Sequence, residues 1–212
     1  MGKPILSSVL LAACLLPGLT GCGGKAKTAA GQATPVAAVR KWATCMLEFD
    51  KAGFMESLTG SKTELRAAEA FMDYLCTLKD FKDAVVKSYG ERGWRAFEQE
   101  GGAKLSLNLS DNRQQLDKAQ WKVSGDSAEG SLPGESKVLH LTRKSGRWCI
   151  HAKDILTGGD GDLEKFASTW SRLAALLREK KRRIGQPGVT AESLDKELGA
   201  DMLPILLGRG QP

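Results

Sequence analysis

LHLTRKSGRWCI, residues 139–150, decides the fold of this chain. Apolar and polar side chains alternate on both sides of Ser145-Gly146, a residue pair typical of a tight turn. A period of two belongs to a strand with one buried face, because successive side chains point to opposite sides of the sheet. The stretch therefore predicts a β-hairpin with Trp148 and Ile150 on the face toward the core.

The hairpin ends a longer series of short segments with the same period. The turn signals Gly125-Asp126 and Pro133-Gly134 separate these segments from one another. The expected strands are Gln120–Val123, Ser127–Leu132, Lys137–Arg143 and Arg147–Ala152, and the alternation of Leu105, Leu107 and Leu109 predicts another before them. Short strands joined by tight turns predict an antiparallel meander.

Upstream of the strands the apolar residues recur with the period of a helix. Thr34 and Pro35 are typical of an N-cap and a first turn, and Ser61 with Glu64 is typical of a capping box. The expected helices run from Pro35 to about Lys51, from Ser61 to about Leu78 and from about Phe81 to Glu100, with a break at Gly53, a short piece containing Phe54, Met55 and Leu58, and interruptions at Gly90 and Gly93. Helices that precede a run of strands predict the α+β class.

Two more helices are expected downstream of the strands. Asp162 is placed to cap the first, which runs from about Leu163 to Arg183, and Thr190 caps a short second one. The first helix ends in a basic run, Arg178–Arg183, which either complements the helix dipole or lies on a lipid surface. The apolar cluster in Asp201–Leu207 must be covered, either by the Leu163 helix or by a partner protein.

Two segments of the strand region resemble a known family. VSGDSA, residues 123–128, is similar to the strand, Gly-Asp turn and strand of the NTF2-like superfamily, which includes SnoaL-type cyclases and ketosteroid isomerase. Residues 139–150 resemble the hairpin of that family, which ends in Gly-x-Trp-x-Ile. The resemblance implies an NTF2-like domain over residues 35–156, in which N-terminal helices pack on a curved antiparallel sheet to form a cone, followed by a C-terminal helical extension over residues 157–212. It also implies a cavity between helices and sheet, where family enzymes place an acid or base in apolar surroundings.

Few polar groups are available to such a cavity. The candidates are Asp73, Tyr74, Tyr89, His140 and His151, and none of them belongs to a catalytic motif that transfers residue by residue. Asp73 and Tyr74 flank the apolar stripe of their predicted helix, so they equally suit its solvated edge.

The chain has two histidines, so imidazole chemistry must use His140 or His151. Strand alternation places His151 with Cys149 on the face opposite Trp148, and it leaves His140 with no carboxylate two positions away. A general base is usually tuned by burial or by a charged neighbour. Both histidines are therefore expected to be ordinary residues of the sheet surface.

No metal ion or other cofactor is expected. The segment Gly158–Asp162 carries alternating carboxylates, as calcium loops do, but the rest of such a loop is missing. No Cys/His cluster has the spacing of a zinc site. Cys45 and Cys76 fall on neighbouring predicted helices and form a candidate disulfide, the alternative being that they and Cys149 are buried thiols.

The N-terminus resembles the signal of a bacterial lipoprotein. Lys3 precedes an apolar run, Ile5–Leu19, that is shorter than the roughly 20 residues of a membrane-spanning helix. Leu19-Thr20-Gly21-Cys22 is similar to a lipobox, and the resemblance implies a signal peptide over residues 1–21, cleavage before Cys22, and attachment of lipid, palmitate included, to Cys22. Residues 22–34 lack large apolar side chains and are expected to form a flexible tether.

The residue after the cysteine indicates which membrane holds the anchor. In bacterial lipoproteins an Asp at that position favours the inner of two membranes, and Gly23 occupies it here. The resemblance therefore implies a lipid-anchored protein of the cell envelope, facing outside the cytoplasm, with the outer membrane favoured where two are present. The alternative is an ordinary secretory signal with an incidental cysteine.

The formal net charge of the chain is +6. Outside the cytoplasm a basic surface is expected to meet anionic lipid headgroups or wall polymers, and no nucleic acid. We therefore expect a non-catalytic envelope lipoprotein that binds a small apolar ligand, a wall component or another envelope protein. The alternative is a small pocket enzyme of the isomerase, dehydratase or cyclase type that uses Asp73, Tyr74 or a histidine.

Protein extracted from membranes is expected to begin at Cys22 and to carry lipid there, because the lipobox thiol is the acyl acceptor. Cys22→Ser should abolish both acylation and this processing, whereas Cys14→Ser, inside the expected signal peptide, should change neither. Mass spectrometry of the intact protein and of its N-terminal peptide measures both. Unchanged lipidation of the Cys22→Ser protein would show that the assignment is wrong.

Overall fold

The structure is a computed structural model that describes residues 32–98, 105, 116, 118–131, 138–156 and 162–208. The chain belongs to the α+β class, with helices and an open five-stranded sheet. Several predicted features lie outside the described residues. They are the signal peptide, the tether as far as residue 31, the strand through Leu107 and Leu109, the Pro133-Gly134 turn and residues 157–161 of the acidic loop.

The four predicted strands that end in the decisive hairpin are confirmed as an antiparallel meander. They are β2 (Gln120–Ser124), β3 (Ser127–Ser131), β4 (Val138–Lys144) and β5 (Arg147–His151). Each pairs with the next, and the sheet order is β1-β5-β4-β3-β2. Gly125, Ser145 and Gly146 have positive φ, which is the backbone that tight hairpin turns require.

The expectation of a purely antiparallel sheet is wrong at one edge. Leu58, which was expected in a short helical piece, lies instead in β1 (Leu58–Thr59), and this strand pairs parallel with β5. The Ile150 amide donates a hydrogen bond to the Ser57 carbonyl over 2.9 Å, so the chain leaving the preceding helix continues alongside β5. Sequence periodicity carries no signal for a pairing this short.

The break between the first two helices is not at Gly53. Helix α1 (Pro35–Leu47) ends before Phe49, whose φ is 57°, and α2 (Lys51–Glu56) then starts behind an Asp50 cap that accepts from the Gly53 amide. Gly53 lies inside α2. A Cβ at this position would stand 2.6 Å from the Cys45 sulfur, so a larger residue would not fit. This glycine therefore permits close packing and does not end a helix.

Helix α3 (Lys62–Glu98) is continuous where two helices were expected. The capping box is confirmed, since Ser61 and Glu64 exchange hydrogen bonds of 2.7 and 3.2 Å. Lys79 and Asp80, at the expected break, are ordinary helix residues and leave the backbone ladder intact. The predicted interruption at Gly90 is confirmed, with φ 71° and ψ 177°, whereas the one predicted at Gly93 is wrong, because Gly93 is a buried residue of regular helix.

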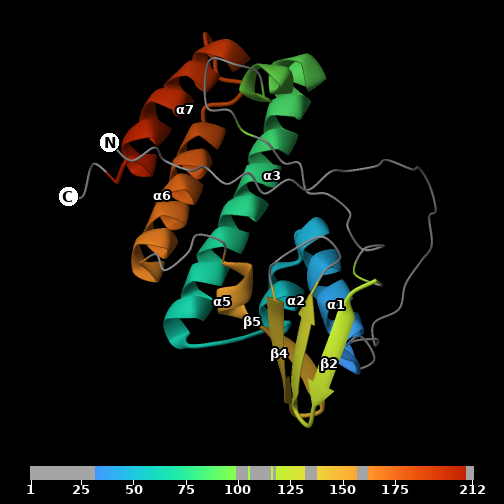
Figure 1. Cartoon of the computed structure of the whole chain (residues 1–212). Coiled ribbons are helices and arrows are strands. Elements are labelled where there is room, and N and C mark those ends of the chain that lie inside the picture. Colours follow the sequence, from blue (N-terminus) through green and yellow to red (C-terminus); the bar gives the residue numbers. More distant parts are fainter. Residues whose placement is uncertain are drawn as a thin grey trace.

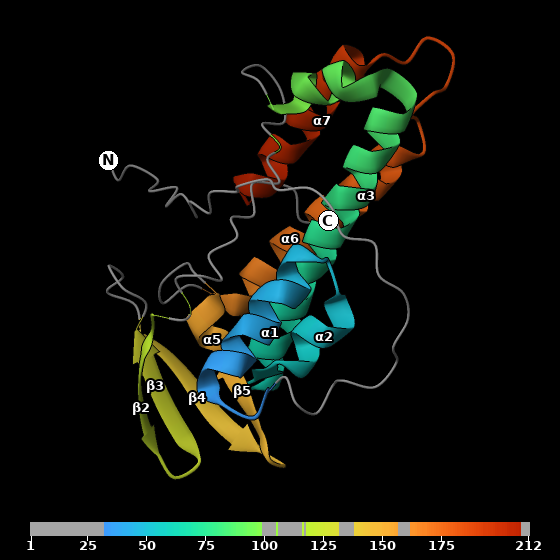
Figure 2. The same ribbon diagram turned by 90° about the vertical axis from the view of Figure 1, so that its right-hand side faces the viewer.

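The C-terminal helices pack along α3. Helix α5 (Ala152–Ile155) follows β5, α6 (Leu163–Lys181) begins behind the predicted Asp162 cap, and α7 (Ala191–Leu206) begins with a capping box at Thr190. Figures 1 and 2 show the sheet, α1 and α2 at one end of α3, with α6 and α7 beside its length. None of the described helices combines the length and apolar character needed to cross a membrane.

An aromatic seam and a row of ion pairs join α6 to its neighbours. Trp170 meets Tyr74 and Phe71 with ring centroids 4.7 and 5.3 Å apart. The basic end of α6 pairs with acids of α3 and α7, through Arg178–Asp73, Lys180–Asp201, Lys181–Asp80 and Arg183–Glu197. These cations therefore hold helices of the same chain together, which accounts for the basic run without a lipid surface.

The far end of the expected tether is part of the folded domain. Gln32 is fully buried, and its side-chain amide donates to the Trp148 carbonyl over 2.9 Å while its oxygen accepts from Lys41 over 3.3 Å. The chain thus joins the domain at Gln32, next to β5.

Trp148 lies in the core as predicted, with 4% of its surface exposed, beside the fully buried Ile150. Cys149 is also buried, although it lies on the opposite face, because the Glu56 carbonyl approaches its sulfur to 4.0 Å. The chain between α2 and β1 therefore covers this part of the outer face.

Trp148→Ala is expected to lower the free energy of unfolding by about 3 to 5 kcal/mol, because truncating a buried Trp loses apolar contacts and leaves a cavity. Val123→Ala, at a position that is 54% exposed on β2, should change it by less than about 0.5 kcal/mol. Denaturant unfolding of both variants provides the comparison. A change below about 1 kcal/mol for Trp148→Ala would exclude a core role.

Candidate functional site: two histidines on the polar face of the sheet

The face of the sheet that points away from the core carries a row of polar side chains. The register pairs Thr59 with His151, Glu129 with His140, and Lys122 with Glu129. The β4–β5 register, continued by one step beyond Leu141↔Ile150, sets His140 opposite His151, and their ring centroids are 6.3 Å apart. Both histidines therefore lie in one row that crosses all the strands.

His140 is held by a carboxylate that the sequence did not indicate. Asp154 Oδ2 accepts from the His140 backbone amide over 2.7 Å and lies 3.0 Å from Nδ1 of its ring. Asp154 comes from α5, which follows β5, and its side chain is nearly buried. An Nδ1–H directed at a carboxylate leaves Nε2 of a neutral imidazole with its lone pair free.

His151 shares a hydrogen bond with a hydroxyl group. Its Nε2 lies 2.7 Å from Thr142 Oγ1 on the neighbouring strand. Burial lowers the pKa of His151 below the ordinary value of 6.5, and Lys153 and His140 act in the same direction, while Asp154 opposes them. His151 is therefore mainly neutral at pH 7.

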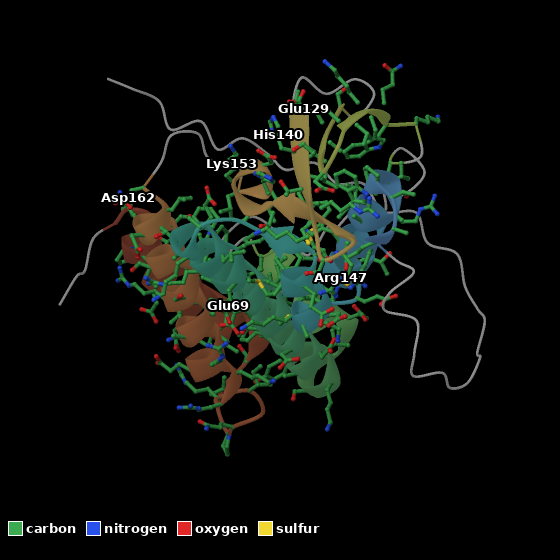
Figure 3. The ribbon with its side chains drawn as sticks, turned by 90° about the horizontal axis from the view of Figure 1, so that it is seen from below. Glu69, Glu129, His140, Arg147, Lys153 and Asp162 are labelled. Atoms are coloured by element: carbon green, nitrogen blue, oxygen red, sulfur yellow. The ribbon has the colours of Figure 1, made fainter. Side chains whose placement is uncertain are left out.

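The expectation that His140 lacks an activating carboxylate is thus wrong. Asp154 is 14 residues further along the chain, beyond the strand neighbours of His140, and it reaches the ring because α5 turns back over β4. The facing of His140 and His151 was predictable, since a two-residue turn at Ser145-Gly146 sets these positions opposite each other. Figure 3 shows His140 near Glu129 and Lys153, with Arg147 at the far end of β5.

The cluster holds part of an acid–base apparatus. His140 with Asp154 has the arrangement of an oriented general base, and Thr142 with His151 pairs a hydroxyl with an imidazole. Within the described part of the chain no carboxylate is hydrogen-bonded to His151, so the Thr142 hydroxyl has a base but that base has no orienting partner. The His140 side chain is 42% exposed, so water competes for its polar contacts.

The remaining candidate residues have structural roles. Asp73 lies 2.6 Å from Arg178 and 3.8 Å from Lys51, which makes it part of the ion-pair row. Tyr74 is buried against Trp170, and this burial raises its pKa to about 12.

Tyr89 secures the linker that follows α6. Its hydroxyl donates to the Val189 carbonyl over 3.1 Å and accepts from the Gly185 amide over 2.9 Å. The linker is thereby bound to α3, and none of the three residues Asp73, Tyr74 and Tyr89 lies beside the histidines.

Cys45, Cys76 and Cys149 are thiols in the structure. The Cys45 sulfur lies 3.7 Å from Asp50 Oδ2, and Cys76 donates to the Phe49 carbonyl over 3.4 Å. Burial raises the pKa of Cys45 to about 11 and also raises the pKa of Cys76 and Cys149. Such thiols carry little thiolate at pH 7 and react slowly, and the Cys45–Cys76 disulfide stays a prediction.

A shallow groove of about 500 Å³ lies between α3 and α6, away from the histidines. Its lining consists of Lys51, Arg66, Glu69, Ala70, Asp73, Glu164, Ala167, Ser168 and Ser171. The charges in it are paired across the groove, with Lys51 3.1 Å from Glu69 and Arg66 3.2 Å from Glu164. The groove therefore offers little unpaired charge to a ligand.

Comparison of the chain with protein-family models, with curated proteins and with solved structures gives no match. Among the residues that the structure describes, no group of three or more His, Cys, Asp and Glu side chains is arranged to hold a metal ion. Function is therefore inferred from the side chains themselves.

Acid is expected to destabilise the fold through His151. Its pKa is lower in the folded chain than in the unfolded chain, so the stability from the neutral ring is complete above pH 6.5 and declines as the pH falls through the folded pKa. Between pH 7 and pH 5.5 the free energy of unfolding should therefore fall more for the parent chain than for His151→Gln. Denaturant unfolding at several pH values measures this, and NMR titration of the ring gives the pKa. A ring that titrates above 6.5 would contradict the prediction.

Proposed function

We propose that this protein is a lipid-anchored lipoprotein of the cell envelope whose domain is a non-catalytic binding or scaffold module. The anchor rests on Leu19-Thr20-Gly21-Cys22, with membrane lipid as the partner of Cys22 and the outer membrane favoured by Gly23 where two membranes are present. The partner of the domain is an envelope protein, a wall component or a small apolar ligand.

The main support for a non-catalytic function is that large apolar side chains fill the interior of the domain. Phe54 and Ile150 are fully buried, and Leu141 and Trp148 are nearly so. An isomerase-type site needs an acid or base that faces an apolar cavity, because desolvation there sets its pKa. In the described residues large apolar side chains occupy the space between the helices and the sheet, which supports a scaffold over a pocket enzyme and leaves the outer surface for binding.

We further propose that residues 35–156 are a distant NTF2-like domain and residues 157–212 a C-terminal helical extension. The meander β2–β5 after N-terminal helices supports the first part, together with the Gly125 and Gly146 turns at the positions of the resemblance. The packing of α6 and α7 on α3, away from the strands, supports the second part.

A second candidate function is an acid–base enzyme, and the His140–Asp154 pair favours it. A carboxylate at 3.0 Å from Nδ1 orients the ring, as in enzymes that use histidine as a base. A substrate would have to bind on the open sheet face, with Nε2 of His140 directed at the proton to be removed.

Turnover assays separate the two functions. The chain that begins at Gly23, which retains every described residue, is expected to give no turnover above the blank with isomerase, dehydratase and cyclase substrates. Reproducible turnover that is lost in His140→Ala and reduced in Asp154→Asn would support the acid–base enzyme instead. Glu129→Gln is the matched control, because it changes a charge in the same row without touching the His140–Asp154 contact.

A further inference from the structure

The turn between β4 and β5 carries three exposed cations close together. Arg143 and Lys144 precede the Ser145-Gly146 turn and Arg147 follows it, and the register sets Lys144 directly opposite Arg147. We call Arg143, Lys144 and Arg147 the basic tip. Like charges directly opposite each other destabilise a sheet, so the fold itself gains nothing from this arrangement.

The basic tip differs from the other basic stretch of the domain in having no acidic partner. The cations at the end of α6 pair with acids of α3 and α7. In the part of the chain that the structure describes, no ion pair joins the basic tip to a carboxylate. Asp126, on the neighbouring turn, meets Arg143 through its backbone carbonyl, which accepts from the Arg143 amide over 2.8 Å. The three charges are therefore left for an anion from outside the domain.

The segment that leads from the expected anchor joins the domain beside the basic tip. The Gln32 side-chain amide donates to the carbonyl of Trp148, which is the residue after Arg147. Figures 1 and 2 show the start of α1 and the β4–β5 turn at the same end of the molecule, with α7 at the other end. The attachment point and the unpaired charges therefore lie together.

We propose that the basic tip binds the anionic headgroups of the bilayer that holds the acylated Cys22. This inference rests on the proposed lipid anchor. Attachment at Gln32 alone does not choose which surface meets the bilayer, but unpaired cations are drawn to anionic headgroups. Each Lys or Arg near such a surface raises the affinity for it by about fivefold. The contact orients the domain, with the β4–β5 turn toward the bilayer and α7 away from it.

Vesicle sedimentation tests the contact with the chain that begins at Gly23, which carries no lipid of its own. At low ionic strength the parent chain is expected to bind phosphatidylethanolamine/phosphatidylglycerol vesicles, because screening of the charges is then weak. Arg143→Gln, Lys144→Gln and Arg147→Gln together should weaken this binding at least about tenfold. Arg143→Lys with Arg147→Lys should keep it, since the charges remain.

The matched control removes three exposed charges from the other end of the molecule, by Lys87→Gln and Arg95→Gln in α3 and Lys196→Gln in α7. It should weaken binding by less than about threefold, because these positions face away from the bilayer. Thermal unfolding of both triple variants should match that of the parent chain, since all six side chains are exposed. The two variants have the same net charge, so a difference between them reports the position of the charges.

An equal loss of binding in the two triple variants would overturn the proposal, because net charge alone would then account for it. So would equal binding of the parent chain to vesicles without phosphatidylglycerol. Tighter binding to soluble polyphosphate than to the vesicles, lost in the basic-tip variant, would assign the tip to an anionic polymer instead of the membrane. The chain lacks Cys22, so failure of acylation and failure of this contact give separate results.

Discussion

The architecture depends on α3 staying helical through Lys79 and Asp80. Its first turns lie beside β1, and its length is packed by α2, α5, α6 and α7. A break at that point would separate the part of α3 that supports the sheet and packs on Trp170 from the part whose Tyr89 holds the linker to α7. Because no glycine or proline interrupts the ladder before Gly90, one helix serves both parts, as Figures 1 and 2 make visible.

The contacts along α3 also decide how the charge of the chain is used. Arg178 and Lys181 of α6 pair with Asp73 and Asp80 of α3, and Lys180 is buried against Asp201. Exposed pairs of this kind contribute little individually, about 1 kcal/mol or less. Their main effect is to fix the position of α6 along α3. The apolar contact between the two helices comes from the aromatic rings around Trp170.

The two histidines show how far a site can be inferred from strand alternation. Alternation correctly placed His140 and His151 away from Trp148 and Ile150. It could not include Asp154, because that carboxylate belongs to a helix whose direction is set by packing on β4 and β5. The result is an oriented imidazole that is 42% exposed on the polar face of the sheet.

Local sequence was enough to predict the strands β2 to β5, the helix caps at Thr34, Ser61, Asp162 and Thr190, and the interruption at Gly90. These features depend on residues close together in the chain, namely turn glycines, capping side chains and the apolar period. The proposed lipid anchor likewise rests on a short linear segment, Leu19-Thr20-Gly21-Cys22. The folded structure was needed to find the parallel pairing of β1, the continuity of α3 through Lys79 and Asp80, the Asp154 contact and the exposure of Leu203, Leu206 and Leu207. Each of these depends on which surfaces meet after the chain has folded, and local propensity does not encode that.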